Sequence, residues 1–513
     1  MTHFFEFRPP VLSKLIHAIL VFIACNRGTF VFFAFAIGPF WVSPARAESP
    51  PLLPPPLLPP PVMESGPSWM FDPRVVVDVD IELPQSSIDQ LPVQMEQERP
   101  YVPATFTMTH SRDGQILRSY GPWEVTLKVK GMYGSFRNLP AGEKAGLKIK
   151  FPKDNRPGGL KKLTLNNMVQ DGSMVREVLA YHVFREMGIA APRTGYARVT
   201  INDIYYGIYL NLETMDDVAL ARWYPETSHL YEGSYGNWWG DMSDPFSGHY
   251  EVDEGDEDDR SDLAALIKIS RSKPKGWLAR MDKVADLEQM AMMWACEWFT
   301  GHWDGYSQHL PNNYYLHADP KGRFTLLPWG TDQTFTWAAR FNEAPEHFIF
   351  NNCLRDPIGR AMCTDALQIL AASWKKLKLE EIALAAHASV ASESQGIDDV
   401  QGFIVSRLEE HKAWAASLPN SPRALVVKRG GIFGKRWVDV SWSPADYSPT
   451  ALDVIAYALE YRSKEGNWKR IYLDRTKRNT RLHNLPLGNY QVRLRAFGWQ
   501  GVSLPISSRV IVR

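Results

Sequence analysis

The sequence has few cysteines, no net charge and no uninterrupted apolar segment long enough for a membrane helix. Four cysteines in 513 residues are too few for a fold that depends on a dense disulfide framework. Lysine plus arginine and aspartate plus glutamate both number 57, so no basic excess exists to bind nucleic acid or an anionic membrane. Any charged ligand must therefore be held by a local group of side chains.

The first 47 residues have the pattern of an export signal. Two basic residues precede an apolar run at 15–25, and a second apolar run ends in Ala45-Arg46-Ala47, a typical cleavage pattern. Asn26 and Arg27 separate the runs, and each is shorter than the ~20 apolar residues of a membrane helix. We expect cleavage after Ala47 and an exported protein (periplasmic, cell-surface or secreted) without an integral membrane span. A retained anchor is the alternative.

The rest of the chain divides into three regions. Residues 48–72 are rich in proline, which favours an extended spacer. Residues 73–418 mix strand and helix patterns, with helices predicted at 175–187 and 287–300. Residues 420–513 show short strands separated by turns, as in a small β-sandwich. The fold class is therefore α+β followed by an all-β domain.

Common metal-binding patterns are absent. The acidic run 253–259 lacks the alternating spacing of calcium loops, so we expect a solvated loop. Cys296, Cys353 and Cys363 remain after signal cleavage, without a Cys-x-x-Cys or a histidine pair that would indicate zinc. Cys353 and Cys363 bracket a short turn-like segment and are the favoured disulfide pair. Cys296, on an apolar helical stretch, is predicted to be a buried thiol.

Polar residues gather around a predicted β-hairpin formed by residues 314–317 and 324–327. Asp304 precedes the hairpin, Asn313 stands at its start and Asp332 follows its second strand, so all three can meet at one end. Phosphoryl transfer needs such groups: a carboxylate to orient the attacking hydroxyl, and oxygen ligands for a metal. On its own, Asp304 is equally well explained as a turn cap.

Upstream residues can supply a phosphate-binding cation. Lys148 and Lys150 share one face of a strand, and Glu177 lies near the start of the following helix, as in the lysine–glutamate pair of kinases. Gly131 and Gly134 lie on the preceding turn and could cover phosphates, although Gly-x-x-Gly is a weak signal. Taken singly, each lysine is explained as a solvated side chain and Glu177 as an acid in the first turn of a helix. The two glycines are explained as a simple turn.

Several segments, in order over residues 73–415, resemble the CotH (spore-coat protein H) kinase family. They are Tyr101-Val-Pro-Ala-Thr-Phe106, Lys148-Ile-Lys-Phe151, Leu163-Thr-Leu-Asn-Asn167, Met174-Val-Arg-Glu-Val-Leu-Ala-Tyr181, Ala191-Pro-Arg193, Tyr206-Gly-Ile-Tyr209 with Glu213, Asn312-Asn-Tyr-Tyr-Leu316 and Leu327-Pro-Trp-Gly-Thr-Asp332. The resemblance implies a divergent protein-kinase-like fold that transfers phosphate from ATP, with Mg²⁺ or Mn²⁺, to serine or threonine of a surface or secreted, possibly serine-rich, protein.

The same resemblance implies roles for the residues above. Asp304 would be catalytic, Asp332 with Asn313 would hold the metal, and Lys148 or Lys150 with Glu177 would position the phosphates, beside Gly131 and Gly134. Many relatives carry an acid where this chain has Gly330, which leaves the metal role to Asp332. The alternative is a catalytically silent surface-binding protein that serves adhesion or envelope assembly.

Residues 420–513 resemble a fibronectin type III domain. Trp442 matches the core tryptophan of an early strand, and Tyr490, in Leu485-Pro-Leu-Gly-Asn-Tyr490, matches a tyrosine corner. The resemblance implies a module that binds protein or carbohydrate.

Overall fold

The computed structural model describes residues 68–233, 241–308, 310–337, 347–432, 435–446, 448–464 and 466–512. The predicted signal peptide and residues 48–67 of the predicted spacer lie outside these ranges. All described residues belong to one compact unit, Leu52–Arg513. No helix in the described ranges is long and apolar enough to cross a membrane.

The N-terminal part is a closed seven-stranded barrel with strand order β1-β2-β3-β4-β5-β7-β6. The strands are Val76–Glu82 (β1), Val102–Arg112 (β2), Gln115–Lys130 (β3), Gly146–Lys150 (β4), Lys162–Asn166 (β5), Thr194–Ile201 (β6) and Ile204–Glu213 (β7). Apolar residues at alternate positions fill the barrel, because successive side chains of a strand point to opposite faces. In β1 these are Val77, Val79 and Ile81, which are buried while Asp80 is exposed.

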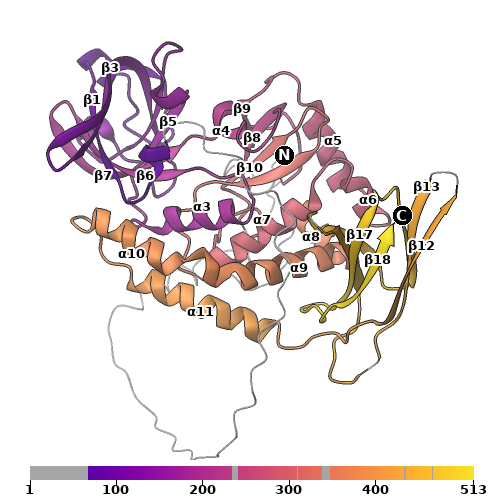
Figure 1. Cartoon of the computed structure of the whole chain (residues 1–513). Coiled ribbons are helices and arrows are strands. Elements are labelled where there is room, and N and C mark those ends of the chain that lie inside the picture. The colour runs from indigo at the N-terminus through magenta and orange to yellow at the C-terminus, as the bar shows by residue number, and fades with distance from the viewer. Residues whose placement is uncertain are drawn as a thin grey trace, which may run out of the picture. The chain divides into compact units, whose positions relative to one another are not determined.

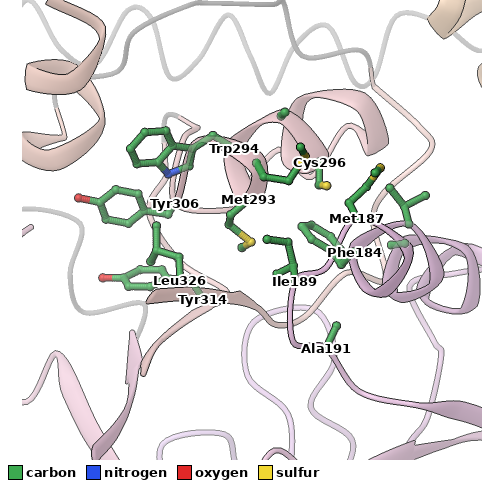
Figure 2. Close-up of a cluster of buried hydrophobic side chains, with 14 of the residues drawn as sticks. Phe184, Met187, Ile189, Ala191, Met293, Trp294, Cys296, Tyr306, Tyr314 and Leu326 are labelled. Carbon is green, nitrogen blue, oxygen red and sulfur yellow. The ribbon is translucent and has the colours of Figure 1, made fainter. Parts of the chain in front are cut away.

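A helix crosses from the barrel to the rest of the molecule. α3 (Arg176–Glu186) follows β5, and the Asp171 carboxylate accepts the Arg176 backbone N–H at 2.9 Å, which caps its first turn. The helix predicted at 175–187 is thus present. Phe184 and Met187 at its far end lie opposite Met293 and Cys296 of the helix α7 (Leu287–Thr300) (Figure 2).

A second sheet has the order β11-β10-β8-β9. Its strands are His229–Gly233 (β8), Tyr250–Glu254 (β9), Tyr314–Ala318 (β10) and Phe324–Pro328 (β11). β10 and β11 form the predicted hairpin, with Tyr314 opposite Pro328. Asp253 and Glu254 therefore end a strand, and the expectation that the whole acidic run is a loop is wrong at these two positions.

Helices pack around this sheet and against α3. They are Asp217–Leu220 (α4), Ser261–Ser270 (α5), Trp277–Met281 (α6), Leu287–Thr300 (α7), Phe348–Arg355 (α8), Pro357–Ser373 (α9), Leu379–Val390 (α10) and Asp398–Trp414 (α11); a further short helix, Gln85–Ile88 (α2), belongs to the barrel region. α7 has the predicted bounds. It contacts α3 and runs along α9, while α10 contacts α3 and α11 (Figure 1).

The C-terminal part is a β-sandwich of a three-stranded sheet, β12-β13-β16, and a four-stranded sheet, β15-β14-β17-β18. The strands are Arg423–Ile432 (β12), Lys435–Ser443 (β13), Ala456–Ser463 (β14), Lys469–Asp474 (β15), Asn479–His483 (β16), Gly488–Phe497 (β17) and Ile506–Val512 (β18). Trp442 is in its core, and the Tyr490 hydroxyl donates a 3.1 Å hydrogen bond to the Pro486 carbonyl.

The cysteines correct one prediction. Cys296, Cys353 and Cys363 are all free and buried, so the disulfide between Cys353 and Cys363 is absent. The segment between them is not a loop: it contains the end of α8 and the start of α9, with Asp356 capping α9. A hydrogen bond with the Cys363 thiol, together with burial, raises the pKa of Cys353 well above its ordinary value. Cys296 is the buried thiol that the sequence predicts.

Candidate active site

The loop after α7 holds two of the predicted site residues together. α7 ends at Gly301, whose φ of 70° allows the chain to leave the helix. The Asn313 amide then donates a 2.6 Å hydrogen bond to Asp304 Oδ2. Asn313 itself has the left-handed φ of 44°, a conformation that asparagine tolerates better than most residues. Asp304 and Asn313 are therefore brought together at the start of the hairpin.

Gly330 leaves room for the Asn313 side chain. A Cβ atom at Gly330 would lie 2.4 Å from Asn313 Oδ1 and 2.5 Å from its Cγ, and the φ of Gly330 is 52°. The Trp329 backbone N–H donates to the Asn313 carbonyl at 3.1 Å, which holds the two segments in this register. Asn313 thus fills the space that a side chain at position 330 would need. An acid there would require Asn313 to move.

A second group consists of Lys130, Glu177 and Asp332. Glu177, in the first turn of α3, accepts a hydrogen bond from the Asn166 side chain through Oε2, while its Oε1 is buried without a hydrogen-bond partner. Lys130, the last residue of β3, has its Nζ 5.1 Å from the centre of the Trp329 ring. The charges that act most strongly on Lys130 are those of Glu177 and Asp332.

Electrostatic coupling through Asp332 connects the two parts. Burial raises the pKa of Asp304 and of Glu177, each to about 8, and Asp332 is the strongest charge acting on both. Burial also raises the pKa of Asp332 to about 6, opposed by Lys130. Burial lowers the pKa of Lys130 itself. Glu177 and Asp332 thus share one ammonium group, and Asp304 adds a third carboxyl group close to Asp332. Full ionisation of all three therefore calls for additional positive charge.

The structure corrects the expected lysine. The ammonium group beside Glu177 belongs to Lys130, because β3 extends to that residue and Gly146, opposite it on β4, leaves its side chain room. Lys148 instead has its Nζ 3.7 Å from Asp253 Oδ1. Lys150 is exposed, with its Nζ 5.9 Å from the centre of the Tyr101 ring. Neither predicted lysine pairs with Glu177.

The predicted glycine turn adjoins the site. Gly131 directly follows Lys130 and has a φ of 111°, and Gly134 has a φ of 80°. The turn is tied to the segment before α3 because the Asn167 side chain donates a 2.9 Å hydrogen bond to the Ser135 carbonyl. A Cβ at Gly134 would lie 2.6 Å from the side-chain nitrogen of Gln170. The turn therefore lies next to Lys130, and its role toward phosphate stays a prediction.

His302 is a site residue that sequence reasoning missed. It is 1% exposed, and its Nε2 lies 3.5 Å from Asp304 Oδ1. Burial lowers the pKa of His302 to about 4, opposed by the Gly330 backbone, so the imidazole is neutral at pH 7. The signal that could have found it is the spacing His302-Trp303-Asp304, which parallels the His-x-Asp of kinase catalytic loops.

Glu297 is a second residue that the sequence did not point to. It lies one turn before the end of α7, is fully buried, and accepts the backbone N–H groups of Tyr306 at 2.9 Å and Ser307 at 2.8 Å. Gly305 makes this possible, since a Cβ there would lie 2.5 Å from Glu297 Oε1. The side chain of one helical glutamate therefore shapes the loop that carries Asp304.

The residues present fit a divalent cation held by mixed ligands. No cluster of three or more His, Cys, Asp or Glu side chains suited to a metal occurs in the described ranges. However, Asp304 Oδ1 is buried without a hydrogen-bond partner, Asp332 is nearby, and the Asn313 amide adds an oxygen. Carboxylate and amide oxygens are ligands that Mg²⁺ and Mn²⁺ accept.

The solved structures that follow each match less than a fifth of this chain. A redesigned β-sandwich protein is 20% identical, over 18% of this chain and 90% of that one, with a TM-score of 0.16. The chicken CNTN1 FN1–FN3 domains (23% identical, 18% of this chain, 30% of that chain) and an FN3 domain of human collagen XX (22%, 19% and 96%) both give a TM-score of 0.15.

Sequence comparison concerns the central region. Residues 127–368 match the family model described as CotH kinase protein. The inner spore coat protein H of Bacillus subtilis (strain 168) is 27% identical over 203 residues, which are 38% of this chain and 55% of that protein. The matched part thus spans about half the length of this relative. Both matches fall on the region that carries the candidate active site, which is therefore similar to the CotH family.

Proposed function

We propose that the chain is an exported atypical protein kinase that transfers the γ-phosphate of ATP to a serine or threonine hydroxyl of a surface or secreted protein. The observation that carries the proposal is that Asp332 is coupled electrostatically both to Asp304 and to the pair of Glu177 and Lys130. Phosphoryl transfer requires this set: a base, oxygen ligands for a metal, and a cation paired with an acid. Residues 73–418 would form the divergent kinase-like domain.

In this proposal Asp304 accepts the proton of the attacking hydroxyl. The hydroxyl oxygen bonds to the γ-phosphorus as the bond from that phosphorus to the β–γ bridging oxygen breaks, and ADP leaves. A base works best when its pKa lies near the working pH, and the pKa of Asp304 is about 8. Asn313, through its 2.6 Å hydrogen bond, would keep the carboxylate oriented, and neutral His302 would support it from the other side.

Lys130 would hold the phosphates, with Glu177 orienting its ammonium group. Asp332 and the Asn313 amide oxygen would hold Mg²⁺ or Mn²⁺, which when bound neutralises charge on the phosphate oxygens. The same cation would favour the ionised form of the three acids, whose pKa values burial raises. The turn containing Gly131 and Gly134 would then cover the phosphates.

The test is nucleotide binding followed by transfer. ATP with MgCl₂ or MnCl₂ at 100 times its dissociation constant should stabilise the protein by about 2.7 kcal/mol in a thermal-shift titration, and Lys130→Gln and Asp332→Asn should remove the shift. Asp304→Asn should keep the shift but lower transfer of radiolabelled phosphate to a serine-rich acceptor by roughly 10²–10⁴-fold. Unchanged labelling by Asp304→Asn contradicts the role of this residue.

A silent binding protein is the second candidate. It is favoured by Gly330, where many relatives carry an acid, and by the absence of a metal cluster of His, Cys, Asp or Glu in the described ranges. The C-terminal sandwich, which we propose to be of the fibronectin type III kind, would then bind protein or carbohydrate in adhesion or envelope assembly. The lack of any thermal shift with nucleotide and metal would favour this function.

A further inference from the structure

Lys148 lies on the same barrel face as Lys130. β3 and β4 are antiparallel, with Lys128 directly opposite Lys148 and Lys130 opposite Gly146. Lys148 and Lys130 are therefore diagonal neighbours, and such positions lie about 7–8 Å apart. Lys148 is one of the charges that act on Lys130. A second ammonium group thus stands one step along the sheet from the candidate phosphate lysine.

The acids opposite Lys148 come from the β8–β9 hairpin. Asp253 Oδ1 lies 3.7 Å from Lys148 Nζ, and Asp253 Oδ2 is buried without a hydrogen-bond partner. Glu232 on β8 stands directly opposite Glu251 on β9, so like charges face each other across the hairpin. The strongest charges acting on Lys148 are those of Asp253 and Glu232, and Glu232 also acts on Lys130. Acidic and basic side chains therefore alternate in the series Asp332, Lys130, Glu232, Lys148 and Asp253.

The contact between Lys148 and Asp253 is loose. At 3.7 Å it is longer than the 2.7–2.9 Å typical of a charge-assisted hydrogen bond. The neighbouring pair, Lys162 and Glu254, is closer, at 3.3 Å, and is hydrogen-bonded. The Lys148 side chain is 14% exposed. Its ammonium group is thus partly desolvated, has no close carboxylate partner and remains accessible to solvent. These properties would allow it to bind a second anion.

We propose that Lys148 is a second polyphosphate-binding lysine, and that Asp253 occupies it until the phosphates of a nucleotide take its place. The inference rests on the proposed nucleotide-binding function. A phosphate oxygen accepts from ammonium donors as a carboxylate does, but a triphosphate carries more charge than one aspartate. Asp253 therefore acts as a competitor that tunes affinity, and the charge of Glu232 acts on both Lys130 and Lys148.

The test is calorimetric titration of the full chain with ATP and with ADP in MgCl₂. Lys148→Gln should weaken ATP binding roughly tenfold and ADP binding less, because one charge-assisted contact is lost. Asp253→Asn should strengthen ATP binding roughly two- to tenfold, the range expected when a partly exposed ion pair no longer competes. In a Lys148→Gln background, Asp253→Asn should have no effect on ATP.

Lys162 and Glu254 provide the matched control, because they form the same kind of ion pair between β5 and the same hairpin. Glu254→Gln should leave both nucleotide affinities unchanged. The inference is overturned if wild-type protein binds ATP and Asp253→Asn lowers only the melting temperature, since the pair is then purely structural. If wild-type protein binds no nucleotide at all, the proposed function itself fails, and the two failures are thus distinguishable.

Discussion

Burial of the Asp304 carboxyl group lowers the stability of the folded protein. The same burial gives this group the raised pKa that its proposed role as a base requires. Asp304 is 6% exposed, and its pKa of about 8 lies far above the ordinary value of 3.8. Between about pH 4 and pH 8 the folded protein therefore holds a proton that the unfolded chain has released. By linkage, this group makes the free energy of unfolding fall as pH rises through that window.

Replacing Asp304 by Asn should separate the two effects. Without metal or nucleotide, Asp304→Asn should match wild type in melting temperature near pH 4 and exceed it increasingly up to pH 8, by about 2–4 °C for each kcal/mol regained. The measurement is a set of thermal melts across this pH range. Asp282→Asn, at an aspartate whose side chain is 67% exposed, is the control and should leave the slope unchanged. Parallel slopes for wild type and Asp304→Asn would contradict the pKa argument.

About half of the candidate site was predictable residue by residue. Asp304, Asn313 and Asp332 flank a hairpin that turn residues make evident, so their meeting follows from local chain geometry. Lys130 was missed because its place depends on how far β3 extends and on its register with Gly146, which involve long-range pairing. In the sequence, Lys148 and Lys150 looked equally suitable. Only the position of the β8–β9 hairpin shows that the partner of Lys148 is Asp253.

Among the helices and strands, α7 was the easiest to predict from the sequence. Its apolar residues, the Asp286 cap that accepts the Gln289 N–H at 3.2 Å, and the terminal Gly301 are all local signals. Its functional contact is not local. Glu297 accepts two backbone N–H groups from residues nine and ten positions later, so the helix positions the Asp304 loop through a single side chain.

Removing that acceptor should affect turnover rather than binding. Glu297→Gln keeps the size but replaces one acceptor oxygen with an NH₂ group, which cannot accept the backbone N–H of Tyr306 or Ser307. Leaving a buried donor unsatisfied costs about 1–3 kcal/mol, so we expect the loop to shift and kcat to fall, with little change in nucleotide affinity. Steady-state phosphate transfer, with the calorimetric titration above, measures both.

Glu288 offers the control on the same helix. It lies in the first turn of α7, but its side chain is exposed, whereas Glu297 is fully buried. Glu288→Gln thus removes a carboxyl group from the same helix without touching the Asp304 loop. A loss of turnover in Glu288→Gln equal to that in Glu297→Gln would show that general destabilisation, and not the loop contact, is responsible.

At the scale of the whole molecule, the sandwich is joined to the helical part by buried charges. Asp365 on α9 accepts hydrogen bonds from Arg495 at 2.9 Å and from the Tyr472 hydroxyl at 3.1 Å, and forms an ion pair with Arg470 at 2.6 Å. Glu460 on β14 accepts from Arg470 and Arg495, both at 2.8 Å. Burial alone would raise the pKa of Asp365, but Arg470 and Arg495 keep it below its ordinary value.

This connection could not be predicted from the sequence. The change of pattern near residue 420 indicates a new domain, and the strands at Trp442 and Tyr490 are present as expected. However, the partners of Asp365 lie more than 100 positions later in the chain, and an isolated Asp in a helix or Arg in a strand is usually solvated. α9 also packs along α7, which leads to the Asp304 loop, so the sandwich supports the helices beneath the candidate active site.

Asp365→Asn should therefore uncouple the two parts. Removing one partner of a buried ion pair typically costs about 3–5 kcal/mol, because the remaining charges stay buried without compensation. Arg470 and Arg495 would be left with Glu460 as their remaining carboxylate partner in this network. We expect urea unfolding of the full chain to change from one transition to two, with the sandwich unfolding separately.

Asp439→Asn breaks the exposed pair with Arg481 in the same sandwich and should cost no more than about 1 kcal/mol. A single, unshifted transition in Asp365→Asn would mean that the interface contributes no coupling, and that the sandwich is a tethered module rather than a structural part of the proposed kinase.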